Sequence, residues 1–526
     1  LAAVLFVGLG STPAWAQERE ADEVVLSDED VLSDEDVLEP AQTEGGDDRD
    51  LFDEDELTVP EVVVTGSRIE EPAGQAAVAT EVIRREEIEQ MGARDAAEVL
   101  EERAGLQLQR SFRGTELWLR GMDPAYTLVL VDGDRVPGRI GGAVDLSRYG
   151  VENIERIEIV RGPSSALYGS DAIGGVVNLI TRDSDRDFEA DALASYGLNN
   201  VIDATARVAG RPEEHLRLRL AGGLHYADAF RRGDDEATTG SSRLQRSLGG
   251  RVDWRPDARH RFRVNVDYLQ LQMQGVDEGA GGALFDRTQL QEQARVSGEH
   301  VLRGPDGLTL LTRFTYNQFR EQYLNDQRGS GQLDDYEDNR EHMGQVTTLV
   351  RFNLEGLGTH SVTVGFEELF QSLDSDRLTT FARRARFAAL AQDEWIPWED
   401  GDASLTIVPG LRYDVDSQFG DQLSPKLSVR FDPVSQLVLR ATYGRGFRAV
   451  DDPPATGTLF SYDNVSNAWT MGLESTATLR VDDVLGVIAG YTLTETWDGQ
   501  NERHLEGRAR HRITAAARVA YEAWEI

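Results

Sequence analysis

The chain has 526 residues, no cysteine and a formal net charge of −39 at pH 7. Without cysteine it forms neither a disulfide nor a thiolate metal site. So large an acidic excess disfavours nucleic-acid binding, because phosphate neutralisation requires clustered Lys and Arg. The length is compatible with several domains or with one large barrel.

The first stretch, "LAAVLFVGLGSTPAWAQ", has the pattern of an export signal. Its apolar run from Leu1 to Leu9 is too short to span a bilayer, and Ala14-Trp15-Ala16 has the small, any, small pattern of a cleavage site. Residues 1–16 are therefore predicted to be a signal peptide that lacks its start, and the chain is predicted to be exported.

Residues 17–60 are strongly acidic and contain the sequence VLSDED twice, from Val25 and from Val31. Like charges at this density repel one another and bury little apolar surface, so we expect an extended, disordered leader. The glycine and the closing glutamate of a calcium loop are missing from the expected positions. Weak calcium binding stays open as an alternative.

The acidic leader is followed by "EVVVTGSR" at residues 61–68. Its pentad of Glu61, Val62, Val63, Val64 and Thr65 favours a β-strand but has no partner strand close in the sequence. It is either the first strand of the next domain or a strand that pairs with the sheet of another protein.

Residues 75–182 have the pattern of an α+β domain. We expect a strand at 80–83, a helix at 85–91 and a helix at 95–103, with Asp95 as N-cap and with Gly92 and Gly105 at the helix ends. Asp132-Gly133 between apolar runs predicts a tight hairpin. The alternation in "IERIEIVRGP" predicts a strand with one face in contact with water.

"IVRGPSSALYGSDAIGGVV", from Ile159 to Val177, is rich in glycine. No lysine follows in phosphate-loop spacing and no serine lies in a G-x-S-x-G frame, so neither a phosphate site nor a catalytic serine is indicated. Gly162 and Gly169 are predicted turn positions. Gly174 and Gly175 are expected where a strand runs close to its neighbours.

Residues 187–526 consist of repeated stretches with alternating polarity, separated by Gly, Asp, Asn and Pro. Examples are "LRLRLAGGLHYA" from Leu216, "HRFRVNVDYLQLQM" from His260, "LTLLTRFTYNQF" from Leu308 and "QLVLRATYGRGF" from Gln436. A soluble sandwich has the same period, but so many hairpins with aromatic residues near strand ends favour an outer-membrane barrel. Only about 16 strands can be recognised after Arg186, whereas a closed barrel of this kind has an even and complete set of strands, so part of the barrel is expected to be missing.

Two motifs carry a specific family resemblance. "LRGMDPAYTLVLVDGDRV" and "ENIERIEIVRGPSSALYGSDAIGGVVNLITR" resemble the plug domain of TonB-dependent outer-membrane receptors. The resemblance implies an α+β plug domain inside a transmembrane antiparallel β-barrel of about 22 strands, the size of plugged transporters. It also implies that Glu61 to Thr65 is the TonB box, the segment that TonB binds.

The chain departs from the family pattern near its C-terminal end. "LSPKLSVRFDPVSQLVLRATYGRGFRAV" resembles a family stretch that ends in Gly-Phe-Arg-Ala-Pro, but Val450 stands in place of the proline. The segment that follows in the family is replaced by a later one, and the sequence ends at Ile526. We therefore expect an internal deletion and a truncated C-terminus, with unpaired strand edges unless a smaller barrel closes.

The resemblance implies energy-coupled uptake across the outer membrane of a Gram-negative bacterium. A scarce nutrient, foremost a ferric siderophore, binds outside, and TonB with its inner-membrane energising complex rearranges the plug. The further partners are outer-membrane lipid and the metal-chelate or cobalamin-like ligand, and a monomer is expected. No enzyme activity, catalytic residue, resident metal or cofactor is implied.

The plug apices and the plug–barrel contact supply the candidate site residues. Ligand contacts are expected at Arg110, Ser111, Phe112, Arg113 and Arg139, whose charged and aromatic groups suit an anionic, partly aromatic ligand. In the alternative interpretation these arginines pair with barrel carboxylates. Arg120 and Arg161 are expected to lock the plug to the barrel.

Three other functions are weighed against siderophore uptake. A receptor for cobalamin or another organic nutrient, haem included, fits the plug and leader equally well. A signal-transducing receptor needs a folded domain before the TonB box, which the acidic leader cannot supply. A hydrolase on a barrel is disfavoured because the eight histidines are scattered and suggest no Ser, His, Asp set.

Overall fold

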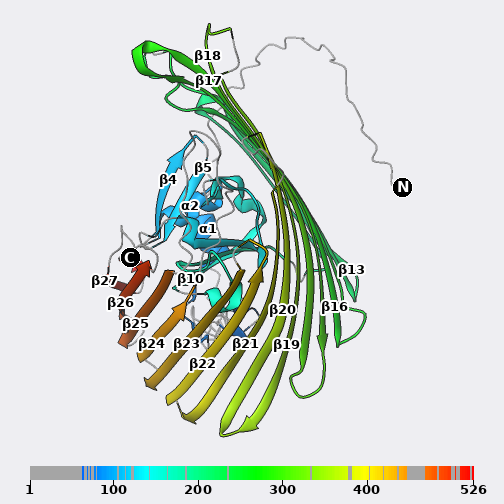
Figure 1. The fold of residues 1–526 in the computed structure, drawn as a ribbon, viewed down its shortest axis with the longest axis vertical. Helices are drawn as coiled ribbons and strands as arrows, with labels where there is room; N and C mark the ends of the chain where they lie inside the picture. The colour runs from blue at the N-terminus through cyan, green and yellow to red at the C-terminus, as the bar shows by residue number, and fades with distance from the viewer. Residues whose placement is uncertain are drawn as a thin grey trace, which may run out of the picture. The chain divides into compact units, whose positions relative to one another are not determined.

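The computed structural model describes most of the chain from Val62 to Glu525, while residues 1–61, 447–467 and several shorter stretches lie outside the described residues. The predicted signal peptide, the acidic leader and the position of Val450 therefore fall outside them. The described part holds a small α+β region followed by one large sheet (Figure 1). No helix among the described residues is long and apolar enough to cross a membrane.

The α+β region, called the plug region below, is built on a five-stranded sheet in the order β3-β10-β11-β6-β7. Strands β11 and β6 are parallel, and the other neighbours are antiparallel. The strands are β3 (Thr80–Arg84), β6 (Thr127–Val131), β7 (Asp134–Arg135), β10 (Ile154–Arg161) and β11 (Gly175–Thr181).

Short helices and hairpins complete the plug region. Three strand pairs are separate from the main sheet: β1 with β2, β4 with β5, and β8 with β9. The elements are β1 (Val62–Val63), β2 (Glu71–Pro72), α1 (Arg85–Met91), α2 (Ala96–Glu101), β4 (Leu106–Ser111), β5 (Gly114–Leu119), η1 (Pro124–Tyr126), β8 (Arg139–Ile140), β9 (Ala143–Val144), η2 (Leu146–Arg148), η3 (Val151–Asn153) and α3 (Ser165–Tyr168).

The structure confirms the helix-end and turn residues that were predicted for the first two helices and for the hairpin at Asp132. Gly92 ends α1 in the left-handed conformation, with φ 62°, and the side chain of Asp95 accepts a hydrogen bond from the Glu98 N–H at 3.0 Å. Helix α2 is shorter than expected and ends at Glu101, while Gly105 lies outside the described residues. Asp132 and Gly133 both have positive φ, at 53° and 83°, as a type I′ turn requires.

The plug sheet is buried on both faces, because consecutive apolar side chains point to opposite sides. Ile157 and Ile159 pack with helices α1 and α2, whereas Leu128 and Val160 pack with α3. The expectation that β10 has one face in contact with water is wrong: Glu158 is 0% exposed, because the α3 side of the sheet is covered too.

The large sheet contains 17 described strands, one more than the expected count, and they follow chain order as an antiparallel meander. Strands β12 and β28 stand at its two ends. The strands are β12 (Phe188–Gly197), β13 (Val201–Glu213), β14 (Leu216–Ala227), β15 (Ser242–Trp254), β16 (His260–Glu278), β17 (Leu284–Arg303), β18 (Thr309–Gln327), β19 (Asp335–Gly356), β20 (Gly358–Ser375), β21 (Ala382–Asp400), β22 (Ala403–Asp416), β23 (Gly420–Val434), β24 (Leu437–Arg445), β25 (Ala468–Val481), β26 (Leu485–Asp498), β27 (His511–Tyr521) and β28 (Trp524–Glu525), with the turns η4 (Leu198–Asn200) and η5 (Ala280–Gly282).

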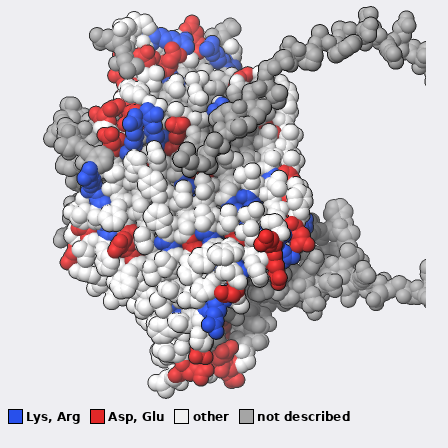
Figure 2. Space-filling model, turned by 90° about the vertical axis from the view of Figure 1, so that its right-hand side faces the viewer, with Lys and Arg blue, Asp and Glu red and all other residues white. Residues whose placement is uncertain are grey.

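Alternate residues of these strands face two different surroundings. On β18, Phe314 and Tyr316 on the outer face are 50% and 40% exposed, whereas Asn317 on the inner face is fully buried against the plug region. A broad area of uncharged residues on the outside of the sheet lies between groups of charged side chains (Figure 2). This is the pattern of a lipid-facing strand surface with a polar interior.

Candidate functional site

The tight turn at Asp132 places a carboxylate where the plug region meets the inner face of the sheet. From the plug side, Thr181 donates its backbone N–H to Asp132 at 2.9 Å and its hydroxyl at 3.0 Å. From the sheet, Arg251 on β15 donates to Asp132 at 3.0 Å and Arg295 on β17 donates at 3.3 Å. One aspartate therefore links a strand of the plug region to two strands of the large sheet β12–β28, which is called the wall below.

The backbone of the same turn binds the wall as well. Arg295 donates to the carbonyl of Val131 at 2.8 Å, and Arg313 on β18 donates to the carbonyl of the next residue at 2.9 Å. Each guanidinium also has a carboxylate of the wall itself, Asp267 for Arg295 and Glu299 for Arg313. The charges of these buried arginines are thus compensated while their remaining donors hold the plug region.

The two aspartates of this turn differ in their electrostatics. Burial by itself raises the pKa of Asp132, but the guanidinium groups of Arg251 and Arg295 outweigh it and hold this pKa far below its ordinary value. Burial raises the pKa of Asp134, and the guanidinium groups of Arg313 and Arg295, both 3.6 Å away, do not reverse the shift. Asp132 is therefore the firmly ionised member of the pair.

A second contact lies at the C-terminal end of α3, where a short helix leaves carbonyl groups without intrahelical partners. Arg68 and Arg412 on β22 donate to the carbonyl of Leu167 at 3.0 and 3.1 Å. Arg135 of the plug region donates to the carbonyl of Ser170 at 2.9 Å. Arginines from the wall and from two parts of the plug region therefore meet at one helix end.

Glu367 on β20 is the carboxylate at the centre of this second contact. It pairs with Arg68 at 2.8 Å and with Arg412 at 2.9 Å, and Arg386 on β21 lies 3.7 Å away. Asp414 on β22 also pairs with Arg412, at 2.9 Å. Since the carboxylate of Glu367 is 1% exposed, its ion pairs are shielded from water and from salt.

The four glycines singled out in the sequence lie around this helix end. Gly162 and Gly169 have positive φ, at 100° and 76°, and a Cβ on Gly169 would lie 2.9 Å from the Arg412 guanidinium. A Cβ on Gly174 would lie 2.9 Å from the Met122 side chain. Gly175, with φ 146°, allows the closest approach, because its Cβ would lie 2.3 Å from a backbone carbonyl of β10.

We expect Gly175→Ala to lower the free energy of unfolding by about 3 kcal/mol, through overpacking added to backbone strain. Gly162→Ala is the matched control, because its φ is also positive but nothing lies within 4 Å of the added Cβ. That variant should lose about 1 kcal/mol, the cost of the backbone conformation alone. Urea unfolding of the two variants gives both values, and equal losses would contradict the assigned close approach.

The structure describes part of the predicted TonB box. Val62–Val63 form β1, which pairs with β2, while Glu61, Val64 and Thr65 lie outside the described residues. The pentad thus has a partner within the chain, the two-residue strand Glu71–Pro72. The structure gives no test of binding to another protein, so the TonB box stays a prediction.

The predicted ligand residues do not form one cluster among the described side chains. Arg110 pairs with Glu101 of the plug region at 2.9 Å. Phe112 lies beneath the Arg287 guanidinium of β17, 4.4 Å from ring centroid to Cζ, and its ring contacts that of Tyr323 on β18. Ser111 closes its own turn by donating to the carbonyl of Gly114. Arg113 and the side chain of Arg139 lie outside the described residues.

Of the two predicted locking residues, the structure describes only Arg161. Its ion pair with Glu81 on β3 lies within the plug region. Arg120 lies outside the described residues. Among the contacts that the structure describes between plug region and wall, those of Asp132 and Glu367 each join several arginines to one carboxylate.

These anchoring residues were not identified from the sequence. Asp132 was interpreted only as a turn residue, and Arg68 only as the last residue of the segment 61–68 that contains the predicted TonB box. The arginines of the wall do show a signal, since Arg251, Arg295 and Arg412 occupy buried positions in strands along which buried and exposed residues alternate. The residues around such an arginine in the sequence do not predict which atom of the plug region it binds.

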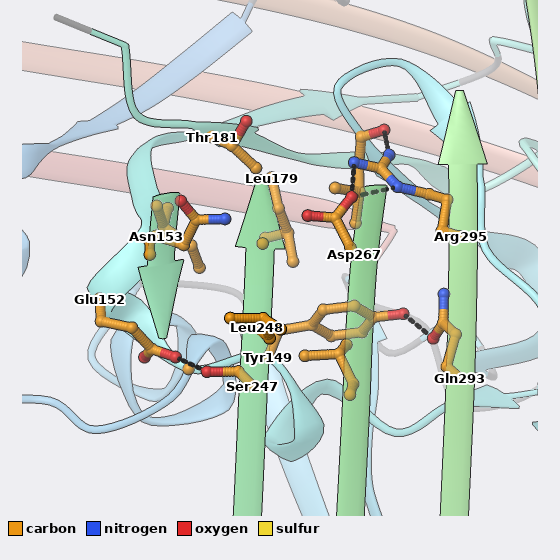
Figure 3. A pocket seen from close by; sticks show the side chains of 16 residues that line it. Tyr149, Glu152, Asn153, Leu179, Thr181, Ser247, Leu248, Asp267, Gln293 and Arg295 are labelled. Carbon is orange, nitrogen blue, oxygen red and sulfur yellow. Dashed lines mark hydrogen bonds and ion pairs between the residues drawn. The ribbon is translucent and has the colours of Figure 1, made fainter. Parts of the chain in front are cut away.

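A cavity of about 60 Å³ lies between the plug region and strands β14 to β17 (Figure 3). Tyr149 crosses it and donates to Gln293 of β17 at 3.2 Å, and Glu152 accepts a hydrogen bond from Ser247 of β15. Side-chain atoms of Glu152 and Asn153 in its lining have no hydrogen-bond partner among the described atoms. Among the described residues, no group of three or more His, Cys, Asp or Glu is placed to hold a metal ion.

Family models match both parts of the chain. The TonB-dependent receptor plug domain matches residues 72–176, and the TonB-dependent receptor-like beta-barrel matches residues 226–451. Over 420 residues the chain is 28% identical to the iron-regulated outer membrane virulence protein of Vibrio cholerae, covering 74% of this chain and 60% of the relative. It is 26% identical over 411 residues to the vitamin B12 transporter BtuB of the same species, covering 74% and 62%.

Solved structures show the same fold. The siderophore receptor PirA from Acinetobacter baumannii superposes with a TM-score of 0.66 at 16% identity, over 84% of this chain and 78% of that one. A variant of the ferric enterobactin receptor PfeA from Pseudomonas aeruginosa gives a TM-score of 0.68 at 17% identity, over 88% and 86%. The chain spans about three fifths of the length of the curated relatives quoted above. By its plug region and by its strand sheet, the chain belongs to the TonB-dependent receptors of the Gram-negative outer membrane.

Proposed function

We propose that this chain takes up a ferric siderophore across the outer membrane by TonB-driven rearrangement of its plug region. TonB, with its inner-membrane energising complex, binds the pentad Glu61 to Thr65, and the barrel works as a monomer in outer-membrane lipid. The process needs binding and movement but no covalent chemistry, and it needs neither a resident metal nor a cofactor.

The contact of Arg68 is the observation that carries the coupling step. Arg68 lies three positions after Thr65, is 9% exposed and packs over the ring of Tyr168 at 4.8 Å. The same guanidinium pairs with Glu367 of the wall and donates to the carbonyl of Leu167 in α3. A pull on the pentad therefore acts within a few residues on an ion pair that holds plug region and wall together.

The neighbouring backbone offers little resistance to such a pull. Strand β1 has only two residues and pairs only with the two residues of β2 in the described part of the chain. Two residue pairs are far fewer than a stable hairpin needs. Among the described residues of this segment, the ion pair of Arg68 with Glu367 and its hydrogen bond to Leu167 are buried contacts that extraction has to break.

Val63→Pro tests the coupling step, because proline removes the backbone donor that a captured strand needs. In cells that express the full-length receptor, we expect uptake of ⁵⁵Fe-labelled ferric siderophore to be lost while binding at the cell surface is retained. Val25→Pro in the acidic leader is the matched control and should transport normally. Normal uptake by Val63→Pro would overturn the assignment of the TonB box.

On the ligand side, the described contact of Phe112 with Arg287 and Tyr323 combines aromatic and cationic groups. Arg287 is paired with Asp277 at 2.9 Å, so its charge is partly compensated while its flat face lies on the ring. Such a surface suits an iron chelate with aromatic rings, which can stack on arginine and on Tyr323. The ligand class remains our proposal.

Cobalamin is the second candidate, and one observation favours it. Arg110, a predicted anion contact, is already paired with Glu101 in the plug region, which lowers the positive charge available for an anionic chelate. A relative that transports vitamin B12 matches the chain with comparable identity. Haem and other organic nutrients belong to this alternative, whereas a signal-transducing role has no described feature in its favour.

Phe112→Ala tests the ligand-side proposal. We expect the Kd for the transported chelate to rise about tenfold, or about 1.4 kcal/mol, without loss of folding stability. Phe314→Ala, which removes the same ring from the outer face, is the control and should leave the Kd unchanged. Fluorescence titration of the full-length receptor with ferric siderophores and with cyanocobalamin measures both, and binding of cyanocobalamin alone would replace the first candidate by the second.

A further inference from the structure

A histidine of the wall lies between two carboxylates, and one of these, Glu152, lines the cavity. His225 on β14 has Nδ1 2.9 Å from Asp203 of β13 and Nε2 3.5 Å from Glu152 of the plug region. The His225 side chain is 11% exposed, and these distances leave no room for a water molecule between the groups. His225 therefore contacts a carboxylate of the wall on one side and a carboxylate of the plug region on the other.

The two atoms that face each other across this contact lack other partners. Among the described atoms, neither Nε2 of His225 nor Oε2 of Glu152 has a hydrogen-bond partner, although both are buried. A neutral imidazole has one N–H, and Nδ1 uses it to donate to Asp203. Nε2 then presents a lone pair to a carboxylate oxygen, which is unfavourable, and a proton on Nε2 would supply the donor that both atoms lack.

The other groups around His225 do not provide this proton. Glu152 accepts a hydrogen bond from Ser247. Burial raises the pKa of Glu152, but the nearby His225 imidazole and the Ser247 hydroxyl outweigh burial and keep this pKa below its ordinary value. Asp203 acts electrostatically on Arg94 of the plug region. Other polar and charged groups on the elements packed here are Ser195 on β12, which donates to Asp203, Gln245 and Arg243 on β15, Asp95 at the N-cap of α2, and Glu98 within α2.

We propose that His225 is a protonation-dependent link between the plug region and the barrel wall. As the imidazolium it donates to Asp203 and to Glu152 at the same time and ties η3 to strands β13 and β14. As pH rises and the imidazolium loses its proton, the bond to Glu152 is lost and two buried acceptors face each other. The link is thus present at lower pH and absent at higher pH.

This inference concerns how firmly the plug region is held and does not depend on the ligand. The contacts of Asp132 and Glu367 involve arginine and carboxylate groups, which stay charged across the neutral range. His225 is the described wall residue in contact with the plug region whose charge changes there. The external pH would then set the ease of plug movement through this one contact.

Hydrogen exchange of the full-length receptor in lipid vesicles tests the link. Exchange of residues 146–154 is followed from about pH 6 to about pH 9.5, across the ordinary histidine pKa of about 6.5, with correction for the intrinsic rate. We expect protection to fall about tenfold as pH rises, the size of one charged hydrogen bond. Burial raises the pKa of Asp95 to about 6, so Asp95 also titrates within this pH range. The pH scan is therefore repeated in Asp95→Asn, which should show the same fall in protection, called the pH step below.

Two substitutions have opposite expected results. His225→Gln cannot carry a charge and should give low protection at every pH. Glu152→Gln supplies an amide donor to neutral Nε2 and should keep high protection at every pH. His342→Gln, at a histidine bonded to Tyr316 on the outer face, is the control and should keep the wild-type step. A wild-type protein without a step, or an unchanged step in His225→Gln or in Glu152→Gln, would overturn the link.

Discussion

Replacing Glu367 with alanine should lower the free energy of unfolding by about 3 to 5 kcal/mol, the usual cost of leaving a buried charge without its partner. The guanidinium groups of Arg68 and Arg412 would lose the carboxylate that they share at 2.8 and 2.9 Å. Because Arg68 follows the predicted TonB box, the same variant should also expose residues 62–68. Urea unfolding measures the first effect, and labelling of a cysteine introduced at position 62 measures the second.

Glu368→Ala is the matched control for this variant. Glu368 is the next residue on β20, but it is exposed on the opposite face of the strand. Its loss should change the free energy of unfolding by less than about 0.5 kcal/mol, as is typical of surface substitutions. Equal losses in the two variants, or unchanged labelling at position 62 in Glu367→Ala, would contradict a role for Glu367 in holding Arg68.

Asp132→Asn should be the second most damaging change, with a loss of about 3 kcal/mol or more at neutral pH. The guanidinium groups of Arg251 and Arg295 would then face a neutral amide. The loss should depend on pH with a definite sign. Because the pKa of Asp132 is far lower in the folded chain than in the unfolded one, its ionised form stabilises the fold above about pH 4, the ordinary value.

Below that pH the unfolded chain takes up the proton first, so the advantage of the wild type over Asp132→Asn should shrink as acid is added. Asp134→Asn is the control in the same turn. Burial raises the pKa of Asp134 in the folded state, so removing its charge should cost little or nothing. Denaturant titrations of the three proteins between about pH 3 and about pH 7 separate these results. If the difference in unfolding free energy between the wild type and Asp132→Asn stayed constant across this range, the charge of Asp132 would not contribute to stability.

Local patterns were reliable where neighbours in sequence decide the conformation. Asp132-Gly133 forms the expected turn because adjacent positive φ angles suit these two residues. Gly92 ends α1 because glycine adopts the left-handed conformation easily, and Asp95 begins α2 because its side chain accepts a hydrogen bond from a free backbone N–H. Alternation also predicted the strands well, because a strand with one lipid-facing and one polar face repeats every two residues.

The anchoring contacts were beyond such reasoning. Arg68 and Glu367 are 299 positions apart, and Asp132 and Arg251 are 119 apart. An inward arginine on an amphipathic strand is expected to find a carboxylate, but many carboxylates are available in so acidic a chain. The buried face of β10 was missed because the cover over Glu158 comes from residues that follow in α3 and its flanks.

The sequence by itself determined the two-part organisation, the family and the strand pattern of the barrel, because these follow from residue order, turn chemistry and a two-residue period. Only the tertiary structure decided which charges meet. Arg68 joins the predicted TonB box to Glu367, and His225 reaches Glu152, because the plug region fills the inner side of a curved sheet and brings distant strands to one helix end or one cavity. Burial then gives these contacts their strength, since a charge removed from water needs its partner.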